Sequence, residues 1–201
     1  MIVGNSGALM DLEIAFGVPE NQRVRVAEIV FEAFENEFKN IFGSKSIHLI
    51  SKYLRNDRTV VAISEDVVVG AAGLKVEGKE FIDVSFRQLL RELGFGIFRV
   101  LFLGWIFYNR VKERELLVDV LAVAENMRGK GVGTRLINFT IDFARSRGCR
   151  QIKLFVVDTN QKAKRFYEQL GFREAKTRRV PFPWSKVFCF KKVSEMRYAA
   201  H

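Results

Sequence analysis

The 201-residue sequence predicts one mixed α/β domain. A strand rich in β-branched residues at 116–124 runs directly into a glycine-rich loop and an amphipathic helix, and a second strand followed by a helix comes at 151–170. With 48% hydrophobic residues, the chain can bury one substantial core. Neither an internal repeat nor a low-complexity linker divides the chain, so we expect a single domain over residues 1–201.

The first 75 residues predict a strand, a helix and a hairpin. Residues 12–17 are expected to form the first strand, and residues 58–64 and 67–75 two further strands that turn at Glu65-Asp66. Residues 21–41 carry apolar side chains at helical spacing, which predicts an amphipathic helix. Its expected apolar face comprises Val24, Ala27, Phe31, Phe34, Phe38 and Ile41.

The strand at 116–124 ends in a loop with glycine at every second position, Gly129, Gly131 and Gly133, accompanied by Arg128 and Lys130. Glycine permits positive φ and lets an anion approach the main chain closely. The first turn of the following helix offers unpaired N–H groups and the positive end of the helix dipole. The segment therefore predicts a pyrophosphate-binding site.

The helix after this loop is supported by its own pattern. Arg147 lies in the expected last turn and Gly148 directly after it, which is the usual way for a helix to end. The apolar face comprises Leu136, Ile137, Phe139, Ile141, Phe143 and Ala144.

Spacing argues against two other phosphate-binding motifs. A P-loop needs four residues between its first glycine and a Gly-Lys-Ser/Thr, which this chain lacks. The dinucleotide fingerprint needs its third glycine one residue later, and although Asp158 could imitate its ribose-binding acid, too little chain follows for a doubly wound domain. A glycine-rich turn without a ligand remains an alternative.

A second motif begins after the strand at 151–157. Residues 160–172 read Asn-Gln-Lys-Ala-Lys-Arg-Phe-Tyr-Glu-Gln-Leu-Gly-Phe. Over residues 115–174, the two strand, loop and helix motifs together resemble the GNAT superfamily of acyl-CoA-dependent N-acyltransferases. The resemblance implies a central, mostly antiparallel, splayed sheet flanked by helices.

The resemblance also implies a site and a reaction, the transfer of an acetyl group from acetyl-CoA to a primary amine. Main-chain groups of Leu121, Ala122 and Val123 would bond the pantetheine arm. The pyrophosphate would be held by Arg128, Gly129, Lys130, Gly131, Val132, Gly133 and Thr134. The cofactor-contacting residues of the second motif would be Asn160, Lys162 and Tyr167.

Tyr167 matches the family's tyrosine that protonates the departing CoA thiolate. A phenol with an ordinary pKa of about 10 can protonate a thiolate without losing its own proton to water at neutral pH. Simpler interpretations stay open for two residues: Asn160 could only cap its helix, and Tyr167 could only be a core aromatic. A CoA-binding sensor or scaffold that lacks activity is the alternative function.

Asp119 is the candidate general base, because it is the only acid within the strand segment 116–124. Strict alternation would place it on the same face as Leu117, Leu121 and Val123. In the histone-modifying branch of the family the catalytic glutamate would fall near Leu117, which cannot act as a base; this departure argues against a histone-type mechanism. A hydrogen-bonded strand acid without a catalytic role is the alternative.

The C-terminal residues predict two strands and a rigid aromatic turn. Residues 172–178 are expected to form one strand and residues 186–193 the closing strand. Between them, Pro181-Phe-Pro-Trp184 predicts the turn, with Trp184 covering the core.

An insertion at about 79–115 does not belong to the family pattern. Its residues 93–108 are largely apolar but include Arg99 and three glycines, so they are too short and too charged for an ordinary membrane-spanning helix of about 20 apolar residues. We expect a lid over the acceptor groove, a helix that forms a homodimer, or a contact with a membrane surface. The N-terminal residues do not resemble a signal peptide.

Charge and composition restrict the remaining possibilities. Residues 128–201 carry 18 Lys or Arg against 5 Asp or Glu, whereas residues 1–127 carry 15 against 18. Steering of anionic CoA is sufficient to explain this, and nucleic acid is an improbable partner because the cations are dispersed. Cys149 and Cys189 suggest no disulfide framework and a cytoplasmic location. The isolated His48 and His201 suggest no metal cofactor.

Overall fold

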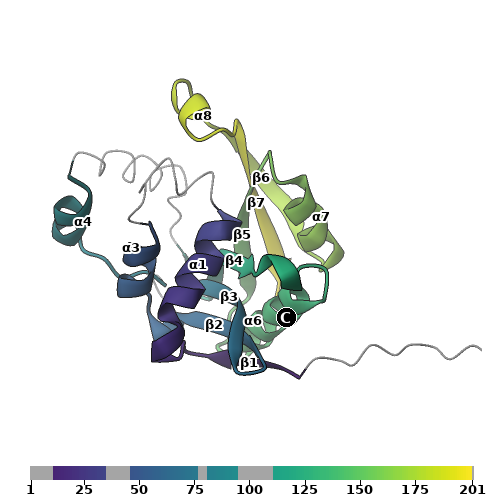
Figure 1. The fold of residues 1–201 in the computed structure, drawn as a ribbon. Helices are drawn as coiled ribbons and strands as arrows, with labels where there is room; N and C mark the ends of the chain where they lie inside the picture. The colour runs from purple at the N-terminus through teal and green to yellow at the C-terminus, as the bar shows by residue number, and fades with distance from the viewer. Residues whose placement is uncertain (1–10, 35–45, 77–80, 95–110, 201) are drawn as a thin grey trace, which may run out of the picture.

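A seven-stranded sheet forms the centre of the molecule (Figure 1), as seen in a computed structural model that describes residues 11–34, 46–76, 81–94 and 111–200. The strand order is β1-β2-β3-β4-β5-β7-β6. Neighbouring strands are antiparallel except for the parallel pair β4 and β5. The strands are β1 Leu12–Phe16, β2 Thr59–Ser64, β3 Val67–Val76, β4 Glu115–Val123, β5 Gln151–Val157, β6 Arg173–Arg179 and β7 Lys192–Ala199. The mixed α/β class and the mostly antiparallel sheet are confirmed.

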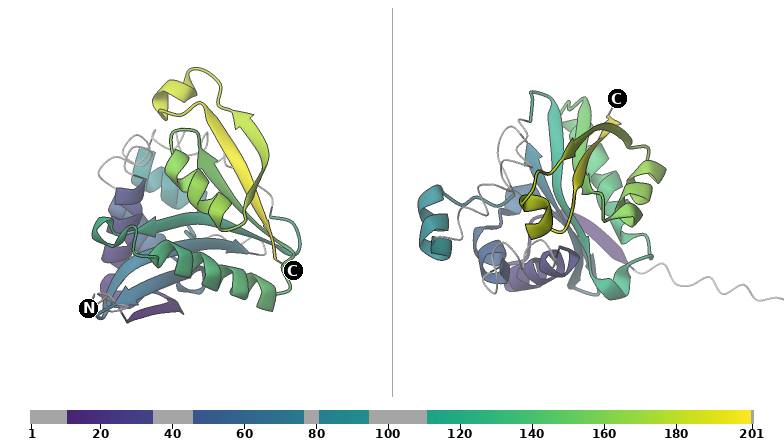
Figure 2. Two further views of the ribbon diagram at one scale, coloured as in Figure 1. Left: turned by 90° about the vertical axis from the view of Figure 1, so that its right-hand side faces the viewer. Right: turned by 90° about the horizontal axis from the view of Figure 1, so that it is seen from above.

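Helices cover both faces of the sheet (Figures 1 and 2). On one face lie α1 Arg23–Ala33 and α3 Ser46–Tyr53, and on the other lie α6 Val132–Ser146 and α7 Gln161–Gln169. The remaining helical segments are α4 Phe86–Leu93, α8 Trp184–Val187 and the 3-10 turns η1 Glu20–Gln22, η3 Asn56–Arg58 and η5 Glu125–Met127. The main core lies between the sheet and these two helical layers.

Close packing of α6 onto the sheet depends on Gly70 in β3. A Cβ at this position would lie 3.1 Å from Cγ1 of Val132 and 3.2 Å from both Leu136 Cδ1 and the carbonyl oxygen of Ala122. Because two of these atoms belong to α6 and one to β4, Gly70 sets how closely the start of α6 approaches the middle of the sheet.

Several sequence predictions are confirmed. The hairpin of β2 and β3 turns at Glu65 and Asp66, which take φ values of 51° and 60°, as the tight turn that joins two antiparallel strands requires. Helix α6 buries Leu136, Ile137, Ile141 and Ala144 and is followed by Gly148 at φ 67°. Phe139 and Phe143 of the same helix contact Phe16, with ring centroids 5.6 and 4.5 Å away.

The expected apolar face of the first helix is partly wrong. The expected member Ala27 is buried, but Val24 is 54% exposed, and α1 also buries Val26, Ile29 and Val30. The reason is that α1 packs against β3 and β4 on one side and against α3 on the other, so its buried face is broader than one stripe of side chains. The expected members Phe38 and Ile41 lie outside the described residues.

The predicted closing strand at 186–193 is also wrong. Residues 184–187 form the short helix α8, and β7 begins only at Lys192. The alternation that suggested a strand comes from Phe188 and Phe190, which pack with Val180 and Val193 in a separate apolar cluster at the end of the β6–β7 hairpin. Trp184 packs against this cluster and not in the main core.

Part of the insertion at 79–115 is helical. Helix α4 begins with a reciprocal cap between Ser85 and Gln88 and buries none of its residues. The apolar stretch 93–108 lies outside the described residues from 95 onward. Within the described ranges, no helix is both long enough and apolar enough to span a membrane.

Candidate active site

The sheet opens between β4 and β5. The two strands pair from Glu115 with Gln151 to Val118 with Leu154, and the register goes no further. The rest of β4 is paired on one side only, with β3, while the end of β5 pairs with β7. A gap therefore separates the ends of two neighbouring parallel strands, which is the splayed sheet that the family resemblance implied.

A β-bulge interrupts β4 at Asp119. Val120 pairs with Gly73 and Val118 with Leu74, so two residues that follow each other in β3 face three in β4. The extra residue shifts the alternation of side chains along the strand by one position. Asp119 itself is exposed.

This bulge corrects the predicted grouping of Leu117, Asp119, Leu121 and Val123 on one face, because Leu117 lies on the face opposite Leu121 and Val123. Val123 pairs with Gly70, which faces α6, so Val123 and Leu121 face the α6 side. Val120 pairs with Gly73, where a Cβ would lie 2.5 Å from Phe81, on the opposite face. Leu117 also belongs to that opposite face, so the side chains alternate on each side of the bulge but not across it.

Two glycines allow the loop after β4 to fold back into α6. Gly129 and Gly131 have φ values of 77° and 81°, and an added Cβ would meet no atom within 4 Å at either position. Both are therefore glycine for conformation, since other residues rarely adopt positive φ. The space beside them stays open toward the strand end.

The amides at the start of α6 are suited to an anion. The amide of Arg135 donates to the Gly131 carbonyl at 3.1 Å, which makes Val132, Gly133 and Thr134 the first-turn residues, without intrahelical acceptors. The N-cap residue Gly131 has no side chain that could accept from them. Together with the dipole, these amides can hold a diphosphate without a special side chain.

Gly133 has a different role from the other two glycines. An added Cβ would lie 3.3 Å from Cζ of Phe166 in α7 and 3.8 Å from Cγ2 of Val123. Gly133 thus lets the first turn of α6, the end of β4 and α7 meet. The structure brings together three of the segments singled out from the sequence.

The two cations of the loop differ in environment. The Nε atom of Arg128 donates to the carbonyl oxygen of Val123 at 3.1 Å, so this side chain ties the loop to the strand end. Lys130 is exposed in the same loop.

The strand residues whose main chain was predicted to bond pantetheine differ in burial. Ala122 is 2% exposed, whereas Leu121 and Val123 are half-buried.

Helix α7 begins with a cap and carries the buried tyrosine. Oδ1 of Asn160 accepts from the amide of Ala163 at 3.0 Å, which confirms the capping role and leaves the side-chain NH₂ group for other partners. Lys162 is exposed in the first turn. Tyr167 is 8% exposed, and burial raises the pKa of its phenol well above the usual 10.0, so the hydroxyl stays protonated throughout the physiological range.

Two ion pairs that involve buried side chains, one between β4 and β5 and one within β7, were not predicted. Lys153 of β5 is 4% exposed and its Nζ lies 2.5 Å from Oε2 of Glu115, at the closed end of the gap. Burial is the largest single influence on Glu115 and opposes its ionisation. The hydrogen bonds from Lys153 and from the Lys112 amide, together with the attraction of both lysine charges, outweigh burial, so the pKa of this carboxyl is lowered. Glu195 of β7, 4% exposed, pairs with Arg197 at 2.5 Å; the misplaced closing strand concealed this inward-facing acid.

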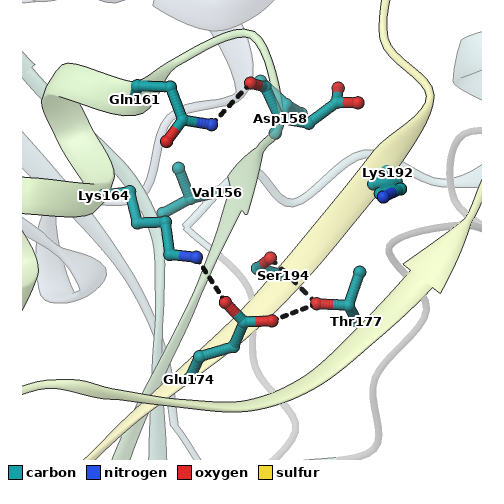
Figure 3. Close-up of a pocket in the computed structure, with 9 residues that line it drawn as sticks. Val156, Asp158, Gln161, Lys164, Glu174, Thr177, Lys192 and Ser194 are labelled. Atoms are coloured by element: carbon teal, nitrogen blue, oxygen red, sulfur yellow. Dashed lines mark hydrogen bonds and ion pairs between the residues drawn. The ribbon is translucent and has the colours of Figure 1, made fainter.

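A polar hollow of about 270 Å³ lies on the other side of β5, beneath α7 (Figure 3). Its polar groups bond one another: Lys164 pairs with Glu174, which also accepts from Thr177. Asp158 accepts from the amide of Lys191 at 3.1 Å, which gives it a structural role at the start of β7. This hollow is separate from the gap between β4 and β5, since β4 and β7 flank β5 on opposite sides.

The chain is similar to known proteins in sequence and in fold. Residues 27–172 match the sequence model of the acetyltransferase (GNAT) family. The chain is 39% identical over 72 residues to an uncharacterized N-acetyltransferase of Methanocaldococcus jannaschii, covering 35% of this chain and 31% of that protein. It is 29% identical over 82 residues to the thialysine N-epsilon-acetyltransferase of Mus musculus, covering 41% of this chain and 45% of that protein.

The fold resembles that of Arabidopsis thaliana Naa50, solved in complex with the bisubstrate analogue CoA-Ac-MVNAL, with a TM-score of 0.54 and 15% identity over 94% of this chain and 98% of that one. At this identity the likeness concerns the fold alone. The chain spans less than half the length of the two curated relatives described above. The family match covers most of the chain and includes the strand, loop and helix that build the gap, and on this ground the chain belongs to the acetyltransferase (GNAT) family.

Proposed function

We propose that this protein transfers an acetyl group from acetyl-CoA to a primary amine. The observation that carries the proposal is the parting of β4 and β5 directly beside the unpaired amides at the start of α6. One end of this gap is suited to a diphosphate and the other offers the one-sided edge of β4. A long ligand with an anionic end and an amide-bearing arm fits both.

Acetyl-CoA has this chemistry. We propose that its pyrophosphate binds at residues 128–134 and that its pantetheine amides pair with the main chain of Leu121, Ala122 and Val123. The open space beside Gly129 and Gly131 supports this placement, because a side chain there would intrude on a ligand. Asn160 and Lys162 would contact the arm from the start of α7.

The reaction needs two proton transfers. The neutral amine attacks the acetyl carbonyl carbon, the amide forms as the carbon–sulfur bond breaks, and the departing thiolate takes a proton. We propose that the Tyr167 hydroxyl donates this proton, which is reasonable because burial keeps the phenol protonated. We propose that Asp119 removes the proton from the ammonium of the acceptor, directly or through water.

The amine would approach from the face of the sheet opposite α6 and α7. Leu117 and Val120, on either side of Asp119, belong to that face, which supports a position of the Asp119 carboxylate near the acceptor amine. The acceptor class stays open between small molecules and peptides or proteins. The mouse relative is named for thialysine, and the Arabidopsis protein was solved with a CoA-peptide analogue.

The domain limits, the role of the insertion and the location of the protein are also proposals. We propose a single GNAT domain over residues 1–201 with residues 93–108 as a lid, a dimer contact or a membrane-surface contact. The two cysteines, Cys149 and Cys189, are both free, which supports a reducing, cytoplasmic environment.

The test measures release of free CoA thiol from acetyl-CoA in the presence of amine pools fractionated by size. The proposal predicts thiol release that depends on the amine, and the mass of the product then names the acceptor class. Acetyl-CoA binding without thiol release across a broad amine panel would contradict it and favour a CoA-binding sensor.

A further inference from the structure

One third of the cations of the C-terminal half, six of 18, lie on the β6–β7 hairpin and outside the CoA loop. The twenty residues 175–194 contain six Lys or Arg and no Asp or Glu. The two acids that border this segment have partners, Glu174 with Lys164 and Glu195 with Arg197. Steering of CoA toward residues 128–134 therefore does not explain this part of the charge.

The hairpin projects from the other described elements and carries α8 at its tip (Figures 1 and 2). Phe182 at this tip is 75% exposed, more than any other large apolar side chain among the described residues. Its ring lies 5.9 Å from Nζ of Lys186. The exposed ring gives the end of the hairpin an apolar group that is available to a partner.

The tip has its own apolar support. Phe188 stacks on Trp184 with centroids 5.9 Å apart and on Phe190 with centroids 6.1 Å apart, and both phenylalanines are almost fully buried. Val180 and Val193 complete this cluster. Phe182 is therefore presented by a packed base, which limits the entropy lost when the ring is buried by a partner.

Cations surround the tip on both faces of the hairpin. Arg178 pairs with Val193 and Arg179 pairs with Lys192, and neighbouring residues of a strand point to opposite faces. Lys186 on α8 and the exposed Lys191, next to Lys192, bring the number of positive charges near the end of the hairpin to five. We call Phe182 together with Arg178, Arg179, Lys186, Lys191 and Lys192 the hairpin tip.

We propose that the hairpin tip docks on an anionic phospholipid surface. Phe182 enters the interface between headgroups and acyl chains, and the five cations of the hairpin tip contact the anionic headgroups. When the end of the hairpin meets a flat membrane surface, cations on both faces of the hairpin can contact the headgroups at the same time. This site is independent of the acetyl-transfer proposal.

A single-stranded nucleic acid is less suited to this arrangement. Such a strand would lie along one face, where successive bases stack on several aromatic rings above a continuous row of cations. Here one exposed ring stands at the end, and the cations near it divide between two faces. The lipid surface explains both the position of the ring and the distribution of charge.

The test is cosedimentation of the full chain with vesicles of phosphatidylcholine mixed with phosphatidylserine, and with vesicles of phosphatidylcholine alone. We expect binding to the anionic vesicles only, weakened by added salt. Phe182→Ala should weaken that binding about tenfold. Phe86→Ala on α4, a comparably exposed phenylalanine at 56%, is the matched control and should leave it unchanged.

Charge variants test the end-on geometry. Lys191→Gln combined with Lys192→Gln should weaken binding about 30-fold, because each cation at an anionic surface contributes about fivefold. Arg173→Gln combined with Lys176→Gln removes the same charge about 10–20 Å further from the tip, beyond the reach of screened electrostatics, and should cost less than about fivefold. Thermal unfolding and acetyl-CoA binding of each variant confirm the fold.

Three results would overturn the proposal. The first is equal binding to neutral and anionic vesicles, or to neither. The second is loss of binding with Phe86→Ala but not with Phe182→Ala, or an equal loss from the two charge pairs. The third is that the wild-type chain binds a single-stranded oligonucleotide and not the anionic vesicles.

Discussion

Replacing Tyr167 by phenylalanine removes one hydroxyl group from a buried ring. The ring packs against Phe166 and Phe172, with centroids 5.1 and 5.7 Å away, and phenylalanine keeps both contacts. We therefore expect the free energy of unfolding to change by less than about 1 kcal/mol. Any larger effect on catalysis must come from the hydroxyl.

The expected catalytic loss follows from the role as proton donor. A positioned general acid accelerates a reaction about 10²- to 10⁴-fold, so Tyr167→Phe should lower kcat at least about 100-fold, or about 3 kcal/mol. Because burial raises the pKa of Tyr167 above 10.0, wild-type kcat should show no loss from this group at any pH below 10. KM for acetyl-CoA should change less than about twofold, since the hydroxyl acts on the departing thiolate.

The assay follows free CoA thiol under steady-state conditions, once an acceptor amine is known. Tyr198→Phe is the matched control, because the Tyr198 ring packs against Phe172 with centroids 5.3 Å apart and its hydroxyl accepts from Arg145 at 3.4 Å, outside the proposed proton path. We expect the control to retain wild-type kcat. An unchanged kcat in Tyr167→Phe, or an equal loss in both variants, would refute the role of Tyr167 as proton donor.

Three further changes test other parts of the site. Gly131→Ala forces alanine to φ 81° and should cost about 1–2 kcal/mol, a fall of about 2–8 °C in Tm by calorimetry, with weaker acetyl-CoA binding by titration; an unchanged affinity would contradict the loop assignment. Asp119→Asn should lower kcat about 100-fold and leave acetyl-CoA affinity intact; an unchanged pH profile of kcat would exclude it as the base. Glu115→Gln leaves Lys153 buried without its carboxylate and should cost about 3–5 kcal/mol. The pKa of Glu115 is lowered from 4.5, so the pair stabilises fully above that pH and is lost as pH falls below it; acid unfolding monitored by circular dichroism should lose this component in the variant.

Much of the fold is encoded in local patterns. The β2–β3 turn, the apolar face of α6 and the cap of α7 at Asn160 each follow from short-range preferences, and the structure confirms them. The bulge at Asp119 could not be predicted, because one extra residue leaves no trace in the composition of β4 and becomes visible only against its partner Gly73. Sequence alternation therefore misassigned the faces of β4.

Two other features depended on long-range packing. Phe188 and Phe190 alternate like strand residues but are buried in the apolar cluster at the end of the β6–β7 hairpin. This pattern hid the true start of β7. The hydrogen bond from Nε of Arg128 to the Val123 carbonyl likewise has no signal in the sequence. In both cases the deciding contact is made with a residue that the local pattern does not identify.

The most direct test of the acetyl-CoA site is amide hydrogen exchange with and without acetyl-CoA. The first-turn amides of α6, Val132 to Thr134, have no intrahelical acceptors, and the edge of β4 near Leu121 to Val123 is not paired with β5. We expect acetyl-CoA to slow exchange in peptides that cover both segments. Protection confined to the polar hollow beneath α7, or an unchanged rate at residues 129–134, would contradict the placement of acetyl-CoA between β4 and β5.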